Sequence, residues 1–449
     1  MSLRSNIMAE SEEQLTSKYK MKKIKLQGLS NVENAISEFS TYYNIPVSRS
    51  NNLEYILNTP LLLKLYCISY SEQEEGNFIC LKSIINGYIS HVNKKICLKK
   101  GYSSKTKIIK RMINIFVDII LETGKRKVNF DDYEMKLNQS DTSVIQNNLI
   151  DELIGEGILS DVCEKKNGEE IYWIDFEYEL FGDYFITDRI LELEKVEEFN
   201  NSQQLSDLFS SENQYFEFLS DSRILEMLTV LLPDIKCKYE VGGFEIINWP
   251  YEIKERIYKD TFFNSLFLRN PKKIDRDLSY SYLLNTNRVL FYDHDRFHSL
   301  FYVVLKLCVY KEHCYNIEFL QNLFSEFTSS GFHREWTIFT SEKLYDSEEF
   351  NNVLYLALSQ INMLSKREKN LLGITLSWCL VSLDENVTIL CEYALLRMYE
   401  EDINGLVDIL KYFSFIEFSK AAIILEKLFL ISMHCIFYSN DIEGKKVMC

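Results

Sequence analysis

Glycine and proline are scarce in this chain, so few positions would break a helix. The 449 residues include only 15 glycines and 5 prolines. These two residues interrupt helices and form most tight turns, so their scarcity favours long helices over a fold with many strands. Apolar residues make up 46% of the chain and charged residues 26%, a balance typical of globular proteins. The sequence therefore predicts a mainly α fold with two to four domains, at roughly 100–200 residues each.

Hydrophobic patterns predict the first elements. Residues 22–27 (KKIKLQ) alternate between polar and apolar, as in a short strand. In the following helical segment, Ser30 and Glu33 have the spacing of a capping box. Thr59 precedes a proline and is therefore expected to be extended. Pro60 suits the first turn of a helix whose residues are apolar nearly all round, which predicts that this helix is buried.

A winged helix is predicted over residues 108–190. Residues 108–121 and 142–159 have helical patterns, and residues 157–178 contain two apolar runs that flank Asn167-Gly168, a dipeptide suited to a hairpin turn. The second helix would be the recognition helix of a DNA-binding winged helix. It carries Asp151, Glu152 and Glu156 and no basic residue, so the charge of DNA would repel it. DNA reading by this domain is therefore not expected.

The chain beyond residue 191 contains repeated amphipathic segments. Residues 351–364 and 403–413 place apolar residues at i, i+3, i+4 and i+7. Such segments over more than 200 residues predict an α-solenoid, in which neighbouring helices cover each other's apolar faces. Residues 241–250 (VGGFEIINWP) break this pattern and predict an irregular insertion. The apolar run 421–438 contains Glu426 and Lys427 and is interpreted as a buried helix, not as a membrane span.

Charge is unevenly distributed along the chain. The net charge is −16, which disfavours general nucleic-acid binding. Residues 82–127, however, contain twelve Lys or Arg residues against Asp118 and Glu122. This basic segment is either a solvated helical surface or a surface that meets an acidic partner, such as another domain of the same protein.

Motifs for catalysis and metal binding are weak. No GxxxxGK[ST] loop is present, so independent ATP hydrolysis is not expected, and GxSxG is also absent. His294 and His298 (HDRFH) have the spacing of a zinc helix, but two ordinary histidines are the preferred interpretation. The group Cys308, His313 and Cys314 matches no standard zinc pattern. The eleven cysteines form no CxxC pair, which indicates reduced thiols in a cytoplasmic protein.

Several segments together resemble the C-terminal half of STAND-class NTPases with a NACHT-like core, in particular their bacterial antiviral (AVAST, or Avs) branch. NTPLLLKLYC is similar to the family's NPLLL segment, and FEYELFGDYFITDRIL resembles its winged-helix closing signature. Residues 23–39 look like the last core strand and the following helix, and residues 372–413 resemble the later helix pairs of the antiviral sensor. The positions that match family motifs are Asn58, Leu61, Phe176, Glu179, Phe181, Asp183, Tyr184 and Trp378.

The resemblance implies a domain order and two residues near nucleotide. It assigns residues 1–27 to the end of the NTPase core, 28–107 to a helical domain, 108–190 to the winged helix and 191–449 to a helical repeat sensor. Many NACHT proteins have a nucleotide-contacting His at the position of Tyr178, so Tyr178 and Pro60 are expected on the nucleotide side. ATP and Mg²⁺ would be cofactors only with the NTPase core supplied, because this chain alone is expected to need none.

The resemblance also implies a function. Such proteins join an effector, an ATPase and a sensor that binds a viral protein, after which they oligomerise. This chain corresponds to the regulatory and sensing portion, so we expect no catalysis by it alone. Its expected partners are a viral or other protein, the remaining NTPase and effector portion, and further copies when complete. Aromatics of the repeats such as Trp336 and Tyr345 could anchor the target if they are exposed, although packing in the core is the expected role of any one of them. The alternatives are a free-standing helical scaffold for a host partner and, remotely, a zinc enzyme using His294 and His298.

Overall fold

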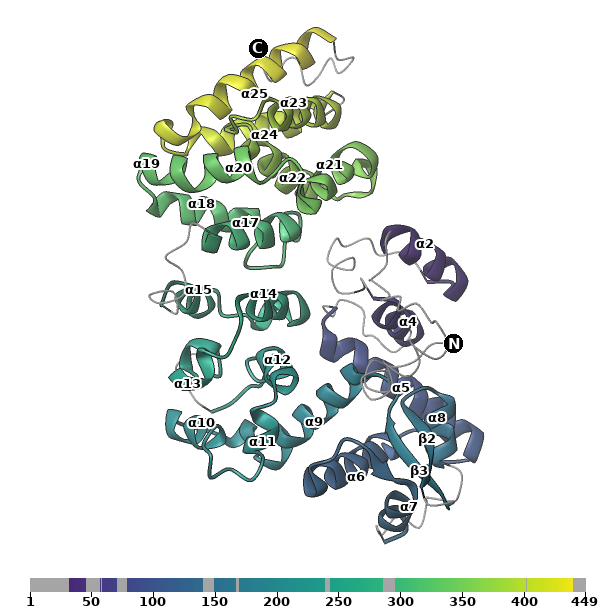
Figure 1. The fold of residues 1–449 in the computed structure, drawn as a ribbon. Coiled ribbons are helices and arrows are strands. Elements are labelled where there is room, and N and C mark those ends of the chain that lie inside the picture. The colour runs from purple at the N-terminus through teal and green to yellow at the C-terminus, as the bar shows by residue number, and fades with distance from the viewer. Residues whose placement is uncertain are drawn as a thin grey trace, which may run out of the picture.

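The computed structural model describes residues 32–45, 57, 59–70, 79–139, 149–166, 169–238, 243–285, 295–400 and 402–438. The described part is mainly helical with one small antiparallel sheet, which confirms the predicted fold class. Figure 1 shows the N-terminal helices and the sheet on one side of the molecule. A long stack of helices rises on the other side and ends at the C-terminal helix.

Three helices precede the winged helix: α2 (Val32–Tyr43), α4 (Pro60–Ser69) and α5 (Leu81–Lys100). Thr59 is extended, with φ −109° and ψ 140°, and its hydroxyl accepts a hydrogen bond from the Leu62 amide at 3.3 Å. Pro60 is in the first turn of α4, and most of that helix is buried, as predicted. The strand predicted at 22–27 and the cap at Ser30 lie outside the described residues.

The winged helix is present, and its sheet has the strand order β1-β3-β2. Its elements follow one another as α6 (Ile108–Thr123), β1 (Val128–Asn129), α7 (Phe130–Gln139), α8 (Leu149–Gly155), β2 (Leu159–Lys166) and β3 (Glu169–Phe176). Strands β2 and β3 pair from Leu159 opposite Phe176 to Lys166 opposite Glu169, which confirms the hairpin. The turn residues 167–168 lie outside the described part.

Ion pairs attach the acidic helix α8 to the basic helix α5. Lys99 Nζ lies 2.7 Å from Glu152 Oε1, and Lys95 Nζ lies 2.7 Å from Glu156 Oε1. The basic segment therefore meets acidic residues of its own chain. Between described residues, at least six of its twelve cations take part in ion pairs with this or other elements: Lys95, Lys99, Lys100, Lys110, Arg126 and Lys127.

Helix α9 (Glu179–Leu193) leads from the winged helix into the stack of helices (Figure 1). The lower stack contains α10 (Ser202–Leu208), α11 (Phe216–Leu219), α12 (Ser222–Leu231), α13 (Tyr251–Lys254), α14 (Lys259–Leu268) and α15 (Arg276–Asn285). The upper stack contains α17 (Asp295–Leu307), α18 (Ile317–Glu326), α19 (Ser329–Phe332), α20 (Ile338–Glu342), α21 (Glu348–Ser359), α22 (Lys366–Cys379), α23 (Glu385–Tyr399), α24 (Ile403–Ser414) and α25 (Phe418–Tyr438). Helices α21, α23 and α25 pack in sequence, as do α22 and α24, which is the arrangement of a solenoid.

Two tryptophans join successive layers of the upper stack. Both side chains are fully buried, and Trp336 Nε1 donates a hydrogen bond to the Trp378 carbonyl oxygen at 2.8 Å. Phe324 packs against both indole rings. Trp336 therefore has the expected core-packing role and is not an exposed anchor, because its indole fills the space between α18 and α22. Tyr345 is exposed.

Helix α25 confirms the predicted helix at 421–438, but only one of its faces is buried. The opposite face exposes large apolar side chains because no described element covers it. No helix in the described part of the chain is long and apolar enough to cross a membrane.

The segment predicted to be an irregular insertion contributes to the core of the lower stack. Trp249 is buried, and its indole Nε1 donates a hydrogen bond to the Phe244 carbonyl oxygen at 2.8 Å. The Arg269 guanidinium, which is fully buried, binds both carboxylate oxygens of Glu245 at 2.6 and 3.1 Å. Its Nε also donates to Asp234 at 3.2 Å. One buried cation thus holds two buried carboxylates from separate segments.

We expect Arg269→Met to destabilise the stack by about 3–5 kcal/mol, since it leaves two buried carboxylates without their cation. Urea unfolding followed by circular dichroism measures the loss. Arg276→Met is the matched control, because Arg276 is exposed and pairs only with its neighbour Asp277. An equal effect of the two substitutions would contradict the role assigned to the buried guanidinium.

Candidate functional site: a cavity where strand β3 meets helix α9

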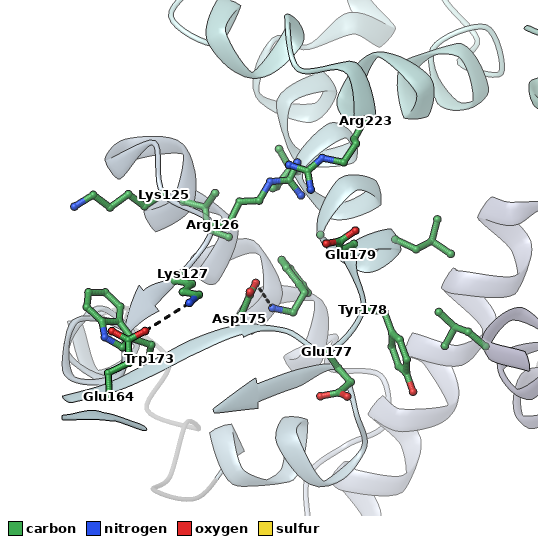
Figure 2. A pocket seen from close by; sticks show the side chains of 16 residues that line it. Lys125, Arg126, Lys127, Glu164, Trp173, Asp175, Glu177, Tyr178, Glu179 and Arg223 are labelled. Carbon is green, nitrogen blue, oxygen red and sulfur yellow. Dashed lines mark hydrogen bonds and ion pairs between the residues drawn. The ribbon is translucent and has the colours of Figure 1, made fainter. Parts of the chain in front are cut away.

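A cavity of about 710 Å³ lies at the junction between β3 and α9. Figure 2 shows that its walls come from distant parts of the sequence. The α6–β1 loop supplies Lys125, Arg126 and Lys127, while α12 supplies Arg223 and α4 supplies Leu61. The remaining wall is the β3–α9 junction, including Tyr178. The cavity therefore joins the N-terminal helices, the winged helix and the start of the stack.

Aromatic packing fixes the junction. The Phe176 side chain at the end of β3 packs on Phe116 of α6 and on Phe185 of α9, with ring centroids 5.2 and 5.7 Å apart. Gly182 allows this close approach, since a Cβ there would lie 3.3 Å from Phe176 Cδ2. Glu179 lies in the first turn of α9, where a negative charge is favourable near the helix N-terminus. The chain therefore changes from strand to helix at a buried, well-packed point.

A chain of charges connects the winged helix to the stack behind the cavity. The Arg126 guanidinium lies 2.5 Å from the buried Asp183 carboxylate and 3.7 Å from Asp221. Asp221 also pairs with Arg223 at 3.3 Å. Burial raises the pKa of Asp183 above its usual value, and the Arg126 guanidinium opposes that rise. Arg126 thus keeps a buried carboxylate ionised at the point where the two parts meet.

The cavity combines balanced charge with unfilled hydrogen-bonding capacity. Its lining carries four basic and four acidic side chains: Lys125, Arg126, Lys127, Arg223, Glu164, Asp175, Glu177 and Glu179. Among the described residues, buried Arg126 Nη2 and Trp173 Nε1 have no hydrogen-bond acceptor. Buried donors are nearly always paired, so these two are suited to acceptor groups of a binding partner. The lining residues include no Ser, Cys or His, so the arrangement suits binding.

Most of the predicted site residues lie at or beside this cavity. Leu61, Phe176, Tyr178 and Glu179 line the cavity together. The side chains of Phe181, Asp183 and Tyr184 are buried beside it, and Tyr184 donates a hydrogen bond to Asn86 at 3.4 Å. Pro60 begins α4 next to Leu61, is exposed and is not among the lining residues, while Asn58 lies outside the described part. Trp378 belongs to the core of the upper stack.

Sequence reasoning did not find Arg126, Trp173, Asp221 and Arg223 as site residues. The run Lys125–Lys127 was visible only as part of the basic segment. Nothing in the local sequence pattern indicates that Arg223 lies across a cavity from it. The available signal was the unusual density of charge directly after a helix-ending glycine, Gly124.

Of the candidate metal ligands, the structure places His298, Cys308 and His313 in the core. The His298 side chain is buried against Phe339, with ring centroids 5.3 Å apart, and His294 lies outside the described residues. Both ring nitrogens of His313 are bonded, one to the Leu266 carbonyl and one to the Tyr315 amide. Burial lowers the His313 pKa to about 4. Within the described residues no group of three or more metal-binding side chains is assembled.

Comparison of the chain with protein-family models, with curated proteins and with solved structures gives no match. The function of this chain is therefore inferred from the sequence resemblance and from the geometry of the cavity.

We expect Arg126→Gln to lower stability by about 2 kcal/mol at pH 7, less than for a fully buried pair because the Arg126 side chain is 26% exposed. Since Arg126 opposes the raised pKa of Asp183, its removal raises that pKa further. A raised folded-state pKa favours the protonated carboxyl, so the loss is greatest at neutral pH and shrinks as pH falls towards 4. Melting temperatures across this pH range measure the trend.

Two further variants control this experiment. Arg126→Gln combined with Asp183→Asn removes both charges and should recover most of the stability at pH 7. Lys125→Gln changes an exposed neighbour and should have little effect. A pH-independent loss in Arg126→Gln would show that the ion pair is not its cause.

Proposed function

We propose that this chain is the regulatory and target-sensing portion of a STAND-type NTPase switch in antiviral defence. The observation that supports this most is the assembly of Leu61, Tyr178 and Glu179 at one cavity. These residues come from two segments that resemble separate motifs of that family. The order of the elements, with helices, a winged helix and then a helical stack, agrees with the proposal.

In this proposal the cavity receives the nucleotide-binding core. Tyr178 and Leu61 offer an apolar contact. Arg126 Nη2 and Trp173 Nε1 have no hydrogen-bond acceptor among the described residues and offer N–H donors to acceptor groups of that core. No ATP chemistry is assigned to this chain alone, because its sequence has no phosphate-binding loop. The proposed location is the cytoplasm, in keeping with free thiols at all ten described cysteines.

Target binding on the stack would reach the cavity through α9 and the Asp221 ion pairs. Asp221 caps the N-terminus of α12 and contacts Arg126 of the winged helix, so a shift of the stack relative to the winged helix changes this pair. A target can move the switch only by binding its open state more tightly than its closed state. The ion pairs across this junction are where such a difference in affinity would act.

For the isolated chain we expect no ATP turnover and no ATP binding detectable by calorimetry. The reason is the missing phosphate loop, whose amides and lysine supply most of the affinity for phosphates. Titration of ATP and Mg²⁺ into the full chain measures this. Binding with a micromolar Kd would contradict the assignment of nucleotide chemistry to a separate core.

For the sensor we expect a viral structural or packaging protein to bind the stack. The full chain, immobilised, is exposed to lysates of phage-infected and uninfected bacteria, and bound proteins are quantified by mass spectrometry. A viral protein enriched only after infection, then shown to bind in purified form, supports the proposal. A host protein bound equally from both lysates would favour the alternative, a helical scaffold.

Matched variants locate the binding surface. Tyr355 on α21 and Tyr393 on α23 are exposed on neighbouring helices, so their substitution by Glu should weaken target binding without unfolding the chain. Tyr172→Glu changes a similarly exposed tyrosine on the hairpin and should leave binding intact. Equal loss in all three variants would argue against recognition by the stack.

A further inference from the structure

The exposed face of α25 is the largest apolar feature at the end of the stack. It comprises Ile423, Phe429, Leu430, Met433 and Phe437, which are between 44% and 70% exposed. Figure 1 shows α25 as the last layer, with the rest of the stack on one side of it. No described element covers this apolar face, and an exposed apolar surface of this kind marks an interaction site.

Five positions of this face are symmetric about Leu430, whereas Phe429 and Met433 have the buried Ile431 and the half-buried Lys427 as their counterparts. Ile423 and Phe437 lie seven residues before and after it, so all three share one side of the helix. Glu426 and His434 lie four residues before and after it. The two outer positions, Ile423 and Phe437, are both apolar. The two inner positions carry side chains that can ionise, the carboxylate of Glu426 and the imidazole of His434.

This symmetry fits a second copy of the same chain. In an antiparallel pair with its two-fold axis at Leu430, Ile423 of each copy faces Phe437 of the other. Glu426 then faces His434, which can donate it a hydrogen bond, and the two Leu430 side chains meet on the axis. A two-fold interface requires such self-complementarity, in which residue i contacts j and j contacts i.

The available area agrees with a dimer. Large apolar side chains bury roughly 150–250 Å² each, so the partly exposed five offer on the order of 500 Å² per copy. A pair would bury about 1,000 Å², which is the lower limit for a specific interface. The eleven residues after α25 include four charged ones (Asp441, Glu443, Lys445 and Lys446), so their sequence provides no matching apolar face.

We propose that this chain forms a two-fold symmetric dimer through antiparallel pairing of α25 about Leu430. The proposal is independent of the assigned sensor function, because it depends only on the face of α25. It predicts a sedimenting species of twice the 53.1 kDa chain mass.

The first test is Leu430→Glu, analysed with the full chain by sedimentation velocity. The substitution places two carboxylates together on the axis beside Glu426, and we expect a shift from dimer to monomer, a weakening of at least about 100-fold. Leu430 is exposed within one copy, so circular dichroism and melting of the monomer should change little. Leu383→Glu is the control, since Leu383 is also exposed but lies before α23, and this variant should remain dimeric.

A second test examines the register. Ile423→Lys and Phe437→Glu should each weaken self-association, because each places two charges against apolar partners. Mixed together, the two variants form a heterodimer with one Lys–Glu pair and one native Ile–Phe pair, so dimerisation should return. A wild-type chain that is monomeric at about 50 µM overturns the proposal, whether or not it binds vesicles or another protein. A dimer unaffected by Leu430→Glu, or variants that do not recover on mixing, also overturns it.

Discussion

The packing of α9 holds the two parts of this molecule together. Nine of its fifteen residues are buried, including every position from Phe181 to Thr187. One side of the helix contacts α6 and β3 of the winged helix, and another contacts α12 of the stack. A helix enclosed in this way cannot rotate without disturbing both neighbours, since protein interiors are close-packed. The cavity at its first turn is therefore sensitive to changes in either part.

Many charges of the basic segment form ion pairs with acidic residues of the same chain. Glu152 of α8 and Glu156 just after it pair with lysines of α5 and attach the winged helix to the preceding helices. Exposed pairs of this kind contribute at most about 1 kcal/mol each. The buried contacts of Arg126 and Arg269 matter more, because each guanidinium neutralises a carboxylate that has little access to water. These two arginines couple segments far apart in sequence.

Local pattern predicted the elements, and tertiary contacts decided the rest. The extended backbone at Thr59, the helix from Pro60 and the hairpin follow from nearest-neighbour chemistry, and all three are present. Contacts with residues 24 to 95 positions away decide the burial of Trp336, the core role of Glu245 and the ion pairs of Asp221. A local sequence pattern does not show such contacts. The exposed face of α25 was missed for the same reason, since apolar periodicity does not say whether a neighbour covers it.

The two ends of the stack carry different surfaces: a charged cavity at one end and the exposed apolar face of α25 at the other. The cavity lies where the stack begins, and α25 lies where it ends (Figure 1). In the proposed pairing the contact is at α25, at the far end of the stack from the cavity. Each dimer would then present two sensing surfaces in a fixed relation. A target with repeated copies, such as a virion component, would bind the second surface at a high effective concentration, so modest affinity at each stack suffices for tight capture.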